Sequence, residues 1–400
     1  MFPQRRSRKP ILLAALIPVA LVLGVWLGGH PRSLPGFVRD PLVGDEDTRI
    51  VREAIDRVHE TYYRAIPRSR LANQAIAGMV DQLHDRFSHY FDPAEYRRFQ
   101  MFQDSQFSGV GMSVTRSAQG LRVAQVFDGS PAKRAGIKPG DVIVAADGKP
   151  LRGRSEEESV ALIKGPPGTD VRLTYVHRRR RHTVTVTRAT VSVPVVATHL
   201  RRVAGVKLGI VALSQFSSGA HGEVDAGLRR LLRRGARGIV LDLRGNGGGL
   251  VKEAQLVASA FLSGGPIVTT RGRDVPSRTL DATGQPIAPR VPLAVLVDSQ
   301  TASASEIVAG ALQDRHRAVV VGRPTFGKGV FQELIGLSNG GALDITAGQY
   351  FTPNGRNLGG GGVRKGKGIT PDVRALDNPD TRVDEALSRA LRLLAARVRK

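Results

Sequence analysis

The stretch Leu293-Ala-Val-Leu-Val-Asp-Ser-Gln-Thr-Ala-Ser-Ala-Ser-Glu306 decides how the second half of this chain folds. Its first five residues are uninterrupted aliphatic side chains, which is typical of a strand buried on both faces of a sheet. A turn of small and polar residues follows, and a helical pattern begins at its end. A buried strand that leads through a short turn into a helix predicts an α/β architecture.

The same alternation of strand and helix extends outward over residues 191–375. Continuous apolar runs are found at 208–213, 238–243, 293–297 and 318–321. Helical patterns lie between them at 222–234, 251–262 and 303–313. We therefore expect an α/β core with a mostly parallel sheet. In residues 376–400 an apolar stripe predicts a C-terminal amphipathic helix, formed by Val383, Leu387, Leu391, Leu394 and Val398.

Residues 104–190 have a different sequence pattern, in which short β-rich runs alternate with turns of glycine and proline. The runs lie at 110–115, 121–126, 141–144, 171–177 and 182–187, and short helices are expected at 132–135 and 156–163. This pattern predicts a small inserted α+β module. The basic run Arg178–Arg181 fits either a solvated hairpin tip or a tip that contacts lipid.

The N-terminal part divides into four segments. Residues 1–10 carry four basic side chains, and residues 11–28 form an apolar run without charge. A basic flank before an apolar run directs export, either as an uncleaved membrane anchor or as a cleaved signal peptide. Residues 29–44 hold three prolines and predict a linker. Residues 45–103 show apolar stripes of an N-terminal helical region, which are too few for a core of their own and should pack on another part.

Composition limits the classes of partner. The 400 residues include 59 Lys and Arg against 35 Asp and Glu, a formal net charge of +24, which favours anionic partners. Because the body is expected outside the cytoplasm and only 5% of residues are aromatic, anionic lipid is favoured over nucleic acid. The absence of cysteine excludes thiol catalysis and disulfide scaffolds. The nine histidines show no metal-ligand spacing, so no metal or other cofactor is expected.

Two segments of the core offer catalytic side chains. Ser303 lies at the strand-to-helix turn, where a hydroxyl is exposed at the carboxyl end of a sheet and helix N–H groups are free. Ser303 and Glu306 also fit a capping box, which is the structural alternative. Lys328 lies between two glycines, and in an extended chain it shares a face with Gln332. Apolar neighbours could desolvate this lysine into a base, although an exposed lysine in a glycine turn has the same pattern. No histidine lies in such a turn, which disfavours a Ser–His–Asp triad.

Two glycine-containing loops offer backbone N–H groups. The loop Asp242–Leu250 follows a strand but lacks the pattern of a phosphate loop, so an oxyanion is its expected ligand. The second loop precedes a strand in the middle module and consists of Gly109, Val110, Gly111 and Met112. Such a loop can hold the C-terminal carboxylate of a peptide while the peptide adds to the sheet as an extra strand. The alternative is a module that only packs.

Together these motifs resemble the carboxyl-terminal processing peptidases, which are tail-specific serine proteases with an inserted PDZ domain. The resemblance covers nearly the whole chain. It rests on five segments in a fixed order, which are Gly109–Gly111, Gly136–Asp141, Asp242–Leu250, Thr301–Ile307 and Pro324–Gly329. It implies a serine endopeptidase that cleaves proteins near or from their C-termini, with the PDZ domain binding the substrate C-terminus and gating activity.

The resemblance also implies roles for single residues. Ser303 would be the nucleophile, Lys328 the general base and Gln332 the group that orients the lysine. The oxyanion hole would be formed by the N–H of Ala304 with that of one of two glycines, Gly248 or Gly249.

The family setting is the bacterial cell envelope. The resemblance therefore implies anchoring in the inner (cytoplasmic) membrane, with the catalytic domain on the extracytoplasmic side. The expected partners are proteins or peptides with free C-termini, and a homo-oligomer or an adaptor protein stays open. Two functions from other classes stay open as well, namely a catalytically silent PDZ scaffold and a binder of anionic surfaces.

Overall fold

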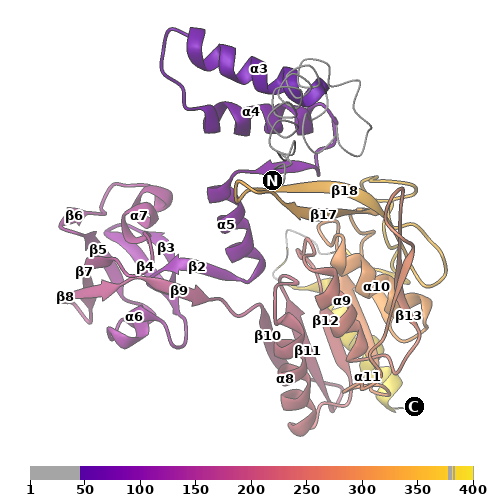
Figure 1. Cartoon of the computed structure of the whole chain (residues 1–400). Coiled ribbons are helices and arrows are strands. Elements are labelled where there is room, and N and C mark those ends of the chain that lie inside the picture. Colours follow the sequence, from indigo (N-terminus) through magenta and orange to yellow (C-terminus); the bar gives the residue numbers. More distant parts are fainter. Residues whose placement is uncertain (1–45, 377–380, 382, 400) are drawn as a thin grey trace, which may run out of the picture. The chain divides into compact units, whose positions relative to one another are not determined.

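The computed structural model describes residues 46–376, 381 and 383–399. They belong to two units, one ending at His84 and one beginning at Asp85, which are described separately (Figure 1). The expected basic flank, anchor or signal, and linker, at 1–10, 11–28 and 29–44, lie outside the described residues. Across the described part, no helix is both long enough and apolar enough to span a membrane.

The first unit contains two helices, α3 (Glu46–Thr61) and α4 (Arg68–Asp81). A hydrogen-bonded ion pair of 2.8 Å joins Arg68 at the start of α4 to Asp56 on α3. Val80 is the one buried residue of the two helices. The pair therefore has almost no core of its own, as the short apolar stripes predict.

The helical region expected over 45–103 is interrupted by a strand. Strand β1 (His89–Phe91) pairs antiparallel with β18 (Ala342–Phe351). Helix α5 (Pro93–Gln103) follows, and its N-cap Asp92 accepts hydrogen bonds from two backbone N–H groups. The helical expectation is wrong at β1, because a three-residue strand is stabilised by its distant partner and leaves no periodicity of its own.

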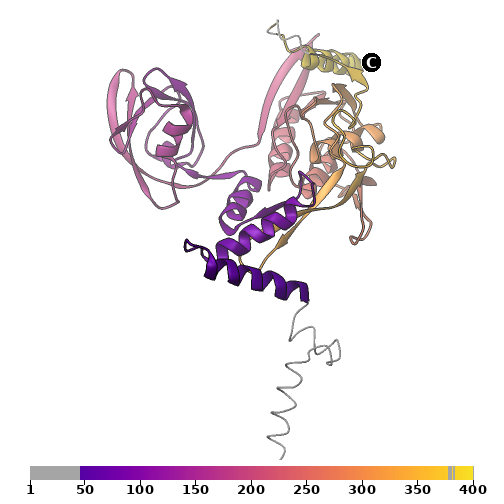
Figure 2. The same cartoon turned by 90° about the horizontal axis from the view of Figure 1, so that it is seen from above.

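The middle module is an antiparallel sheet with the strand order β3-β4-β5-β7-β8. The strands are β3 (Met112–Ser117), β4 (Gly120–Val126), β5 (Val142–Ala146), β7 (Asp170–His177) and β8 (Arg180–Thr187), with β6 (Lys149–Pro150) on β5. Helices α6 (Pro131–Arg134) and α7 (Glu156–Ile163) pack on this curved sheet (Figure 2). Strands β2 (Gln106–Gly109) and β9 (Ala189–Ser192) pair at its two chain ends. The basic run lies at the tip of the β7–β8 hairpin, as both interpretations of it expect.

The core contains a six-stranded sheet with the order β10-β11-β12-β15-β16-β19. The strands are β10 (Val196–Val203), β11 (Val206–Leu213), β12 (Ile239–Asp242), β15 (Leu293–Val297), β16 (Val319–Gly322) and β19 (Val373–Arg374). Strand β10 is antiparallel to β11, and the other four pairings are parallel.

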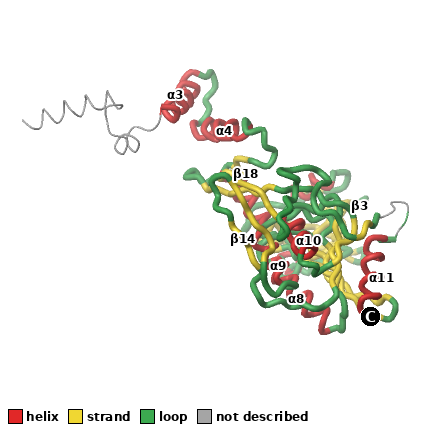
Figure 3. Tube along the Cα trace, turned by 90° about the vertical axis from the view of Figure 1, so that its right-hand side faces the viewer, coloured by secondary structure: helices red, strands yellow, loops and turns green. Residues whose placement is uncertain are grey.

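Helices cover both faces of this sheet, which explains the continuous apolar runs. On one face lie α8 (Ala220–Arg233), α9 (Val251–Ser259) and α10 (Ala304–Asp314), and on the other lies α11 (Glu385–Arg399) (Figure 3). Within β15, Leu293, Val295 and Val297 join the cluster of the three helices, whereas Ala294 and Leu296 join that of α11. The expected C-terminal helix is confirmed, but Val383 precedes it and is exposed.

A second core sheet was not predicted. Its order is β1-β18-β13-β14, with β17 on β18, and all its pairings are antiparallel. The additional strands are β13 (Pro266–Gly272), β14 (Arg278–Asp281) and β17 (Val330–Gly336). The core as a whole is therefore mixed, and the expectation of one mostly parallel sheet was too simple. Strand β17 buries only Val330, so it lacks the continuous apolar run that reveals the other strands.

Candidate active site

Ser303 lies in the turn between β15 and α10. Its φ of 54° and ψ of −116° are values that residues with a side chain rarely adopt, so this turn is strained. The Ser303 N–H donates to Glu306 Oε2 at 2.8 Å, and its hydroxyl faces that of Tyr350, whose pKa it lowers against the larger effect of burial. Ser305, in contrast, is fully buried and donates to the Asn246 carbonyl oxygen at 2.9 Å. Ser303 is therefore the serine of this turn that faces the second sheet.

The backbone conformation next to Lys328 requires a glycine at position 327. Gly327 has a φ of 90°, and a Cβ atom there would lie 2.2 Å from the Arg364 carbonyl oxygen. Lys328 Nζ donates to Gln332 Oε1 at 2.7 Å. The structure thus brings together the two side chains that the four-residue spacing places on one face.

The amine of Lys328 is partly withdrawn from water. Its Nζ lies 4.7 Å from the centre of the Phe87 ring, a contact that the sequence patterns did not reveal. Burial, with some repulsion from Arg86, lowers the pKa of Lys328 below its ordinary value. The attraction that opposes this shift comes from three carboxylates, Asp344, Asp85 and Glu306.

Glu306 joins the serine segment to the lysine segment. Its fully buried carboxylate accepts the N–H groups of Ser303 at 2.8 Å, Gly327 at 2.7 Å and Lys328 at 3.0 Å, and the hydroxyl of Thr325. Burial raises the pKa of Glu306, although these hydrogen bonds favour its charged form. The sequence revealed only the capping-box pairing, because the other donors lie about twenty residues away and are mainly backbone groups.

A cavity of about 520 Å³ opens beside Lys328. Its walls include the rings of Phe87 and Phe326, together with Gly247 and Ala302 from the two loops next to Ser303. The wall is completed by two lysines and two polar residues, namely Lys328, Lys365, Ser299 and Gln300. A space of this size, with both aromatic and polar walls, is suited to holding part of a peptide chain.

Backbone donors surround Ser303. A Cβ atom on Gly248 would lie 2.9 Å from Ser303 Cβ, so this glycine allows the close contact of the two loops. The Gly248 N–H donates to Asn246 Oδ1 at 2.9 Å. The N–H groups of Gly249 and Ala304 have no acceptor in the part of the chain that the structure describes. Two uncommitted donors therefore flank the serine, from the glycine loop and from the first turn of α10.

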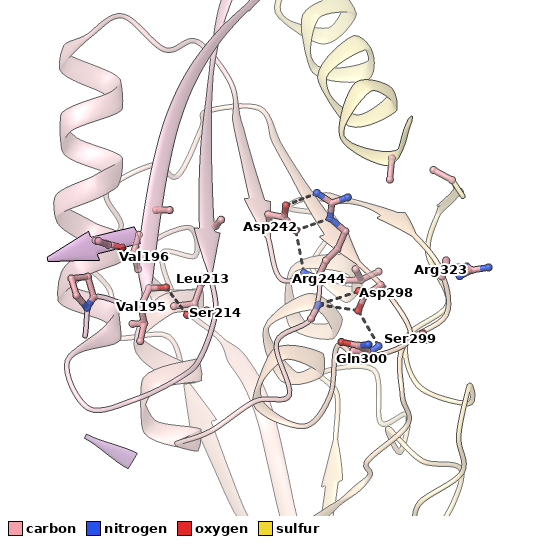
Figure 4. Close-up of a pocket in the computed structure, with 18 residues that line it drawn as sticks. Val195, Val196, Leu213, Ser214, Asp242, Arg244, Asp298, Ser299, Gln300 and Arg323 are labelled. Atoms are coloured by element: carbon pink, nitrogen blue, oxygen red, sulfur yellow. Dashed lines mark hydrogen bonds and ion pairs between the residues drawn. The ribbon is translucent and has the colours of Figure 1, made fainter. Parts of the chain in front are cut away.

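A larger cavity, of about 790 Å³, lies at the carboxyl ends of the core strands (Figure 4). At its wall, Arg244 forms ion pairs with Asp242 at 2.7 Å and Asp384 at 2.8 Å, which raise the pKa of Arg244. The carboxylate of Asp298 accepts the backbone N–H of Gln300 at 2.9 Å. Gln300 also lines the cavity beside Lys328, so the two cavities meet at this residue.

The loop of the middle module leads into a sheet edge. Met112 begins β3, which is the terminal strand of its sheet. Gly111 has a φ of 82°, and a Cβ atom there would lie 2.2 Å from Ser130 Cβ. The N–H groups of Val110 and Gly111 have no acceptor among the described residues. With Gly109 at the end of β2, the loop keeps the geometry that carboxylate binding at an edge strand requires.

The site has no metal-binding group within the described residues, where no three His, Asp or Glu side chains gather to hold an ion. The ring of His221 is bonded to Glu253 at 2.8 Å. Apart from its carbonyl oxygen, which accepts the Ile307 N–H at 2.9 Å, the polar contacts of Ser303 in this part of the chain are with Glu306 and Tyr350.

Comparison with known proteins identifies the family. The description of peptidase family S41 matches residues 207–375, and that of the PDZ domain matches 122–176. A carboxyl-terminal-processing protease of Picosynechococcus sp. is 39% identical over 286 residues, which are 70% of this chain and 69% of that protein. A protein of the same name from Synechocystis sp. is 35% identical over 352 residues, 84% of this chain and 82% of that protein. This chain belongs to peptidase family S41.

Solved structures agree with this membership. A photosystem II D1 C-terminal processing protease superposes with a TM-score of 0.50 at 28% identity, over 88% of this chain and 97% of that chain. A putative S41 protease from Bacteroides fragilis, with a TM-score of 0.52 at 19% identity, supports the fold alone. The S41 peptidase described here is thus a serine-type C-terminal processing peptidase with a PDZ domain, as the motifs predict.

Proposed function

We propose that this S41 peptidase cleaves protein substrates near or from their C-termini through a Ser303–Lys328 centre in which Gln332 orients the lysine. The observation that supports it most is the environment of Lys328. Its amine is desolvated, is bonded to Gln332 and faces a cavity, and the buried carboxylate of Glu306 ties its backbone to that of Ser303.

Neutral Lys328 begins the reaction by taking the proton of the Ser303 hydroxyl, while Oγ attacks the substrate carbonyl. Before attack, the hydroxyl must turn away from Tyr350 toward the lysine amine. Catalytic hydrogen bonds often form only when the substrate is bound.

The tetrahedral intermediate needs donors for its oxyanion. The N–H of Ala304 and the N–H of Gly249 supply them in this proposal, since the Gly248 N–H is already committed to Asn246. Lys328 then gives its proton to the departing amine. Water, deprotonated in turn by Lys328, hydrolyses the acyl-enzyme and restores the serine.

The PDZ domain binds the substrate's free C-terminus in this proposal and gates cleavage. The loop from Gly109 to Met112 takes the carboxylate, and the peptide adds to the free edge of β3. In this proposal, residues 1–28 direct export and act as an inner-membrane anchor, so that the catalytic domain lies outside the cytoplasm. The net charge of +24 favours contact with the anionic lipid of that membrane.

The matched pair Ser303→Ala and Ser305→Ala tests the proposal. Mass spectrometry would follow cleavage of an unfolded protein with an apolar C-terminus. Ser303→Ala should reduce turnover by about 10⁴-fold or more, because the nucleophile is lost. Ser305→Ala should remain active, with reduced stability, because it loses one buried hydrogen bond. The reverse result would refute the assignment, and a wild-type chain that binds C-termini without cleaving them would identify a silent scaffold.

A further inference from the structure

A row of hydrogen-bonded side chains leads away from Lys328, and the proposed mechanism does not account for its far end. Gln332 accepts from Lys328 Nζ through Oε1 at 2.7 Å and donates through Nε2 to Thr346 Oγ1 at 3.0 Å. The Thr346 hydroxyl faces the carboxylate of Asp85 and helps to lower its pKa. The Thr346 N–H also donates to Ser88 Oγ at 3.0 Å, and the Ser88 hydroxyl donates to the same carboxylate at 2.7 Å. The row therefore crosses from β17 to β18 and then to the segment that precedes β1.

Asp85 is firmly placed and charged. Besides the Ser88 hydroxyl, its carboxylate accepts the Phe87 N–H at 3.1 Å. Burial alone would raise the pKa of Asp85, but the hydrogen bonds from Thr346, Ser88 and Phe87, with attraction from His89, keep that pKa below its ordinary value. An ionised carboxylate can only accept hydrogen bonds.

This charge fixes the direction of every bond in the row. The Thr346 hydroxyl has one proton, and the Asp85 carboxylate takes it. Thr346 Oγ1 can then only accept from Gln332, so the carboxamide must present Nε2 to Thr346 and Oε1 to Lys328.

The orientation of the carboxamide matters because a neutral lysine amine has a single lone pair. When Oε1 faces the amine, Lys328 donates an N–H to Gln332 and its lone pair points elsewhere. If the carboxamide turned over, Nε2 would donate to that lone pair, which could then not accept the Ser303 proton.

We propose that Asp85 and Thr346 are positioning residues of this peptidase, which hold Gln332 in the orientation that leaves the lone pair of neutral Lys328 free to accept a proton. The inference rests on the proposed roles of Ser303 and Lys328. Both residues act through Gln332 and touch neither the substrate nor the reacting atoms, and the charge of Asp85 in addition attracts the protonated amine of Lys328.

Thr346→Val tests the inference in the full chain, because it removes the hydroxyl but keeps the shape of the side chain. None of the charged groups that face Lys328 is altered, and these are Asp344, Asp85, Arg86 and Glu306. We expect kcat to fall by about tenfold or more with little change in KM, as for a misplaced general base. Thr346→Ser, which restores the hydroxyl, should recover most of the wild-type kcat.

A double-mutant cycle separates positioning from a structural role. If Thr346 acts through Gln332, then Thr346→Val combined with Gln332→Ala should have the kcat of Gln332→Ala alone. Asp85→Asn also removes a charge that attracts protonated Lys328, so it is compared at a pH where the lysine is neutral in every variant. There it should lower kcat and add nothing further when combined with Thr346→Val. The inference would be overturned if two combined substitutions reduced kcat by the product of their separate factors. A wild-type kcat for Thr346→Val would overturn it as well.

Two controls complete the experiment. Thr269→Val removes, elsewhere on the same antiparallel sheet, a hydroxyl whose hydrogen-bond partner among the described residues is Thr279, and it should keep the wild-type kcat. Ser303→Ala is measured in parallel. If Ser303→Ala still turns over, the proposed function fails, whereas an inactive Ser303→Ala with a multiplicative cycle refutes only the positioning role.

Discussion

The two core sheets place the two halves of the candidate site by different physical means. The sheet that leads to Ser303 is packed by helices on both faces, and every residue of α10 from Ala304 to Leu312 is buried. The antiparallel sheet that carries Gln332 is partly exposed to solvent, since its strand β17 exposes Leu334 and Ile335. Ser303 is therefore positioned mainly by apolar packing and Lys328 by polar contacts.

This difference teaches where substitutions should act. Changes around the serine mainly remove packing, which lowers the stability of the whole core. Changes around the lysine mainly remove hydrogen bonds or water exclusion, which alters the pKa and the orientation of one amine. Glu306 is the exception, since it contacts both segments.

The largest effect is expected on the lysine side. Lys328→Arg should be as inactive as Lys328→Ala, with turnover at least about 10³-fold below wild type, because a guanidinium stays charged and cannot accept a proton. Turnover of a peptide substrate is the measurement. An active Lys328→Arg variant would show that the lysine acts only through its charge, and the contrast between the two sides would lose its chemical basis.

Glu306→Gln should weaken the link between the segment of Ser303 and the segment of Lys328. An amide cannot accept all the N–H groups that the carboxylate accepts, so we expect kcat to fall by about 10²-fold and the free energy of unfolding by about 1–3 kcal/mol. Activity and thermal unfolding are measured together.

The matched control for this variant is Glu253→Gln. Glu253 is also a buried carboxylate that accepts backbone N–H groups, from Gly219 at 3.0 Å and His221 at 2.8 Å. Glu253→Gln should lower the free energy of unfolding and leave kcat per folded molecule unchanged. Equal loss of activity in both variants would show that Glu306 has no special place in the site.

A smaller effect is expected from Phe87, which shields the lysine amine. Phe87→Ala admits water to Lys328, so the desolvation that lowers its pKa weakens and the pKa rises. As the pH is lowered, this variant should therefore lose activity at a higher pH than the wild type, because protonated Lys328 cannot accept a proton. Phe87→Leu keeps an apolar cover and should not move the loss of activity to higher pH. The pH dependence of kcat/KM checks both, and an unchanged profile for Phe87→Ala would exclude this shielding role.

The same contrast explains how far the sequence could predict the fold. Strands buried on both faces, such as β11 and β15, appear as uninterrupted apolar runs, and their helices have clear periodicity. Strand β17 exposes most of its side chains, and β1 is only three residues long. Their pairing with β18 depends on residues far away in the chain, which no local pattern records.

The candidate site divides in the same way. Ser303, Lys328 and Gln332 could be predicted, because motifs and a short spacing mark them. Phe87 and Thr346 could not, since each meets the lysine group only through the tertiary fold. The choice between the two glycines depended on the Asn246 side chain, whose contact with the Gly248 N–H is visible only in the structure.

The central claim is that Lys328 is a neutral base at working pH, and the rate at which Ser303 reacts with a fluorophosphonate tests it most directly. Such labelling needs deprotonation of the serine but no PDZ binding or peptide release. The account predicts that the labelling rate falls as the pH is lowered, with a midpoint below the ordinary lysine value of about 10.4, and that Lys328→Ala abolishes this titration. A midpoint at the ordinary value, or a labelling rate that does not change with pH, would contradict it.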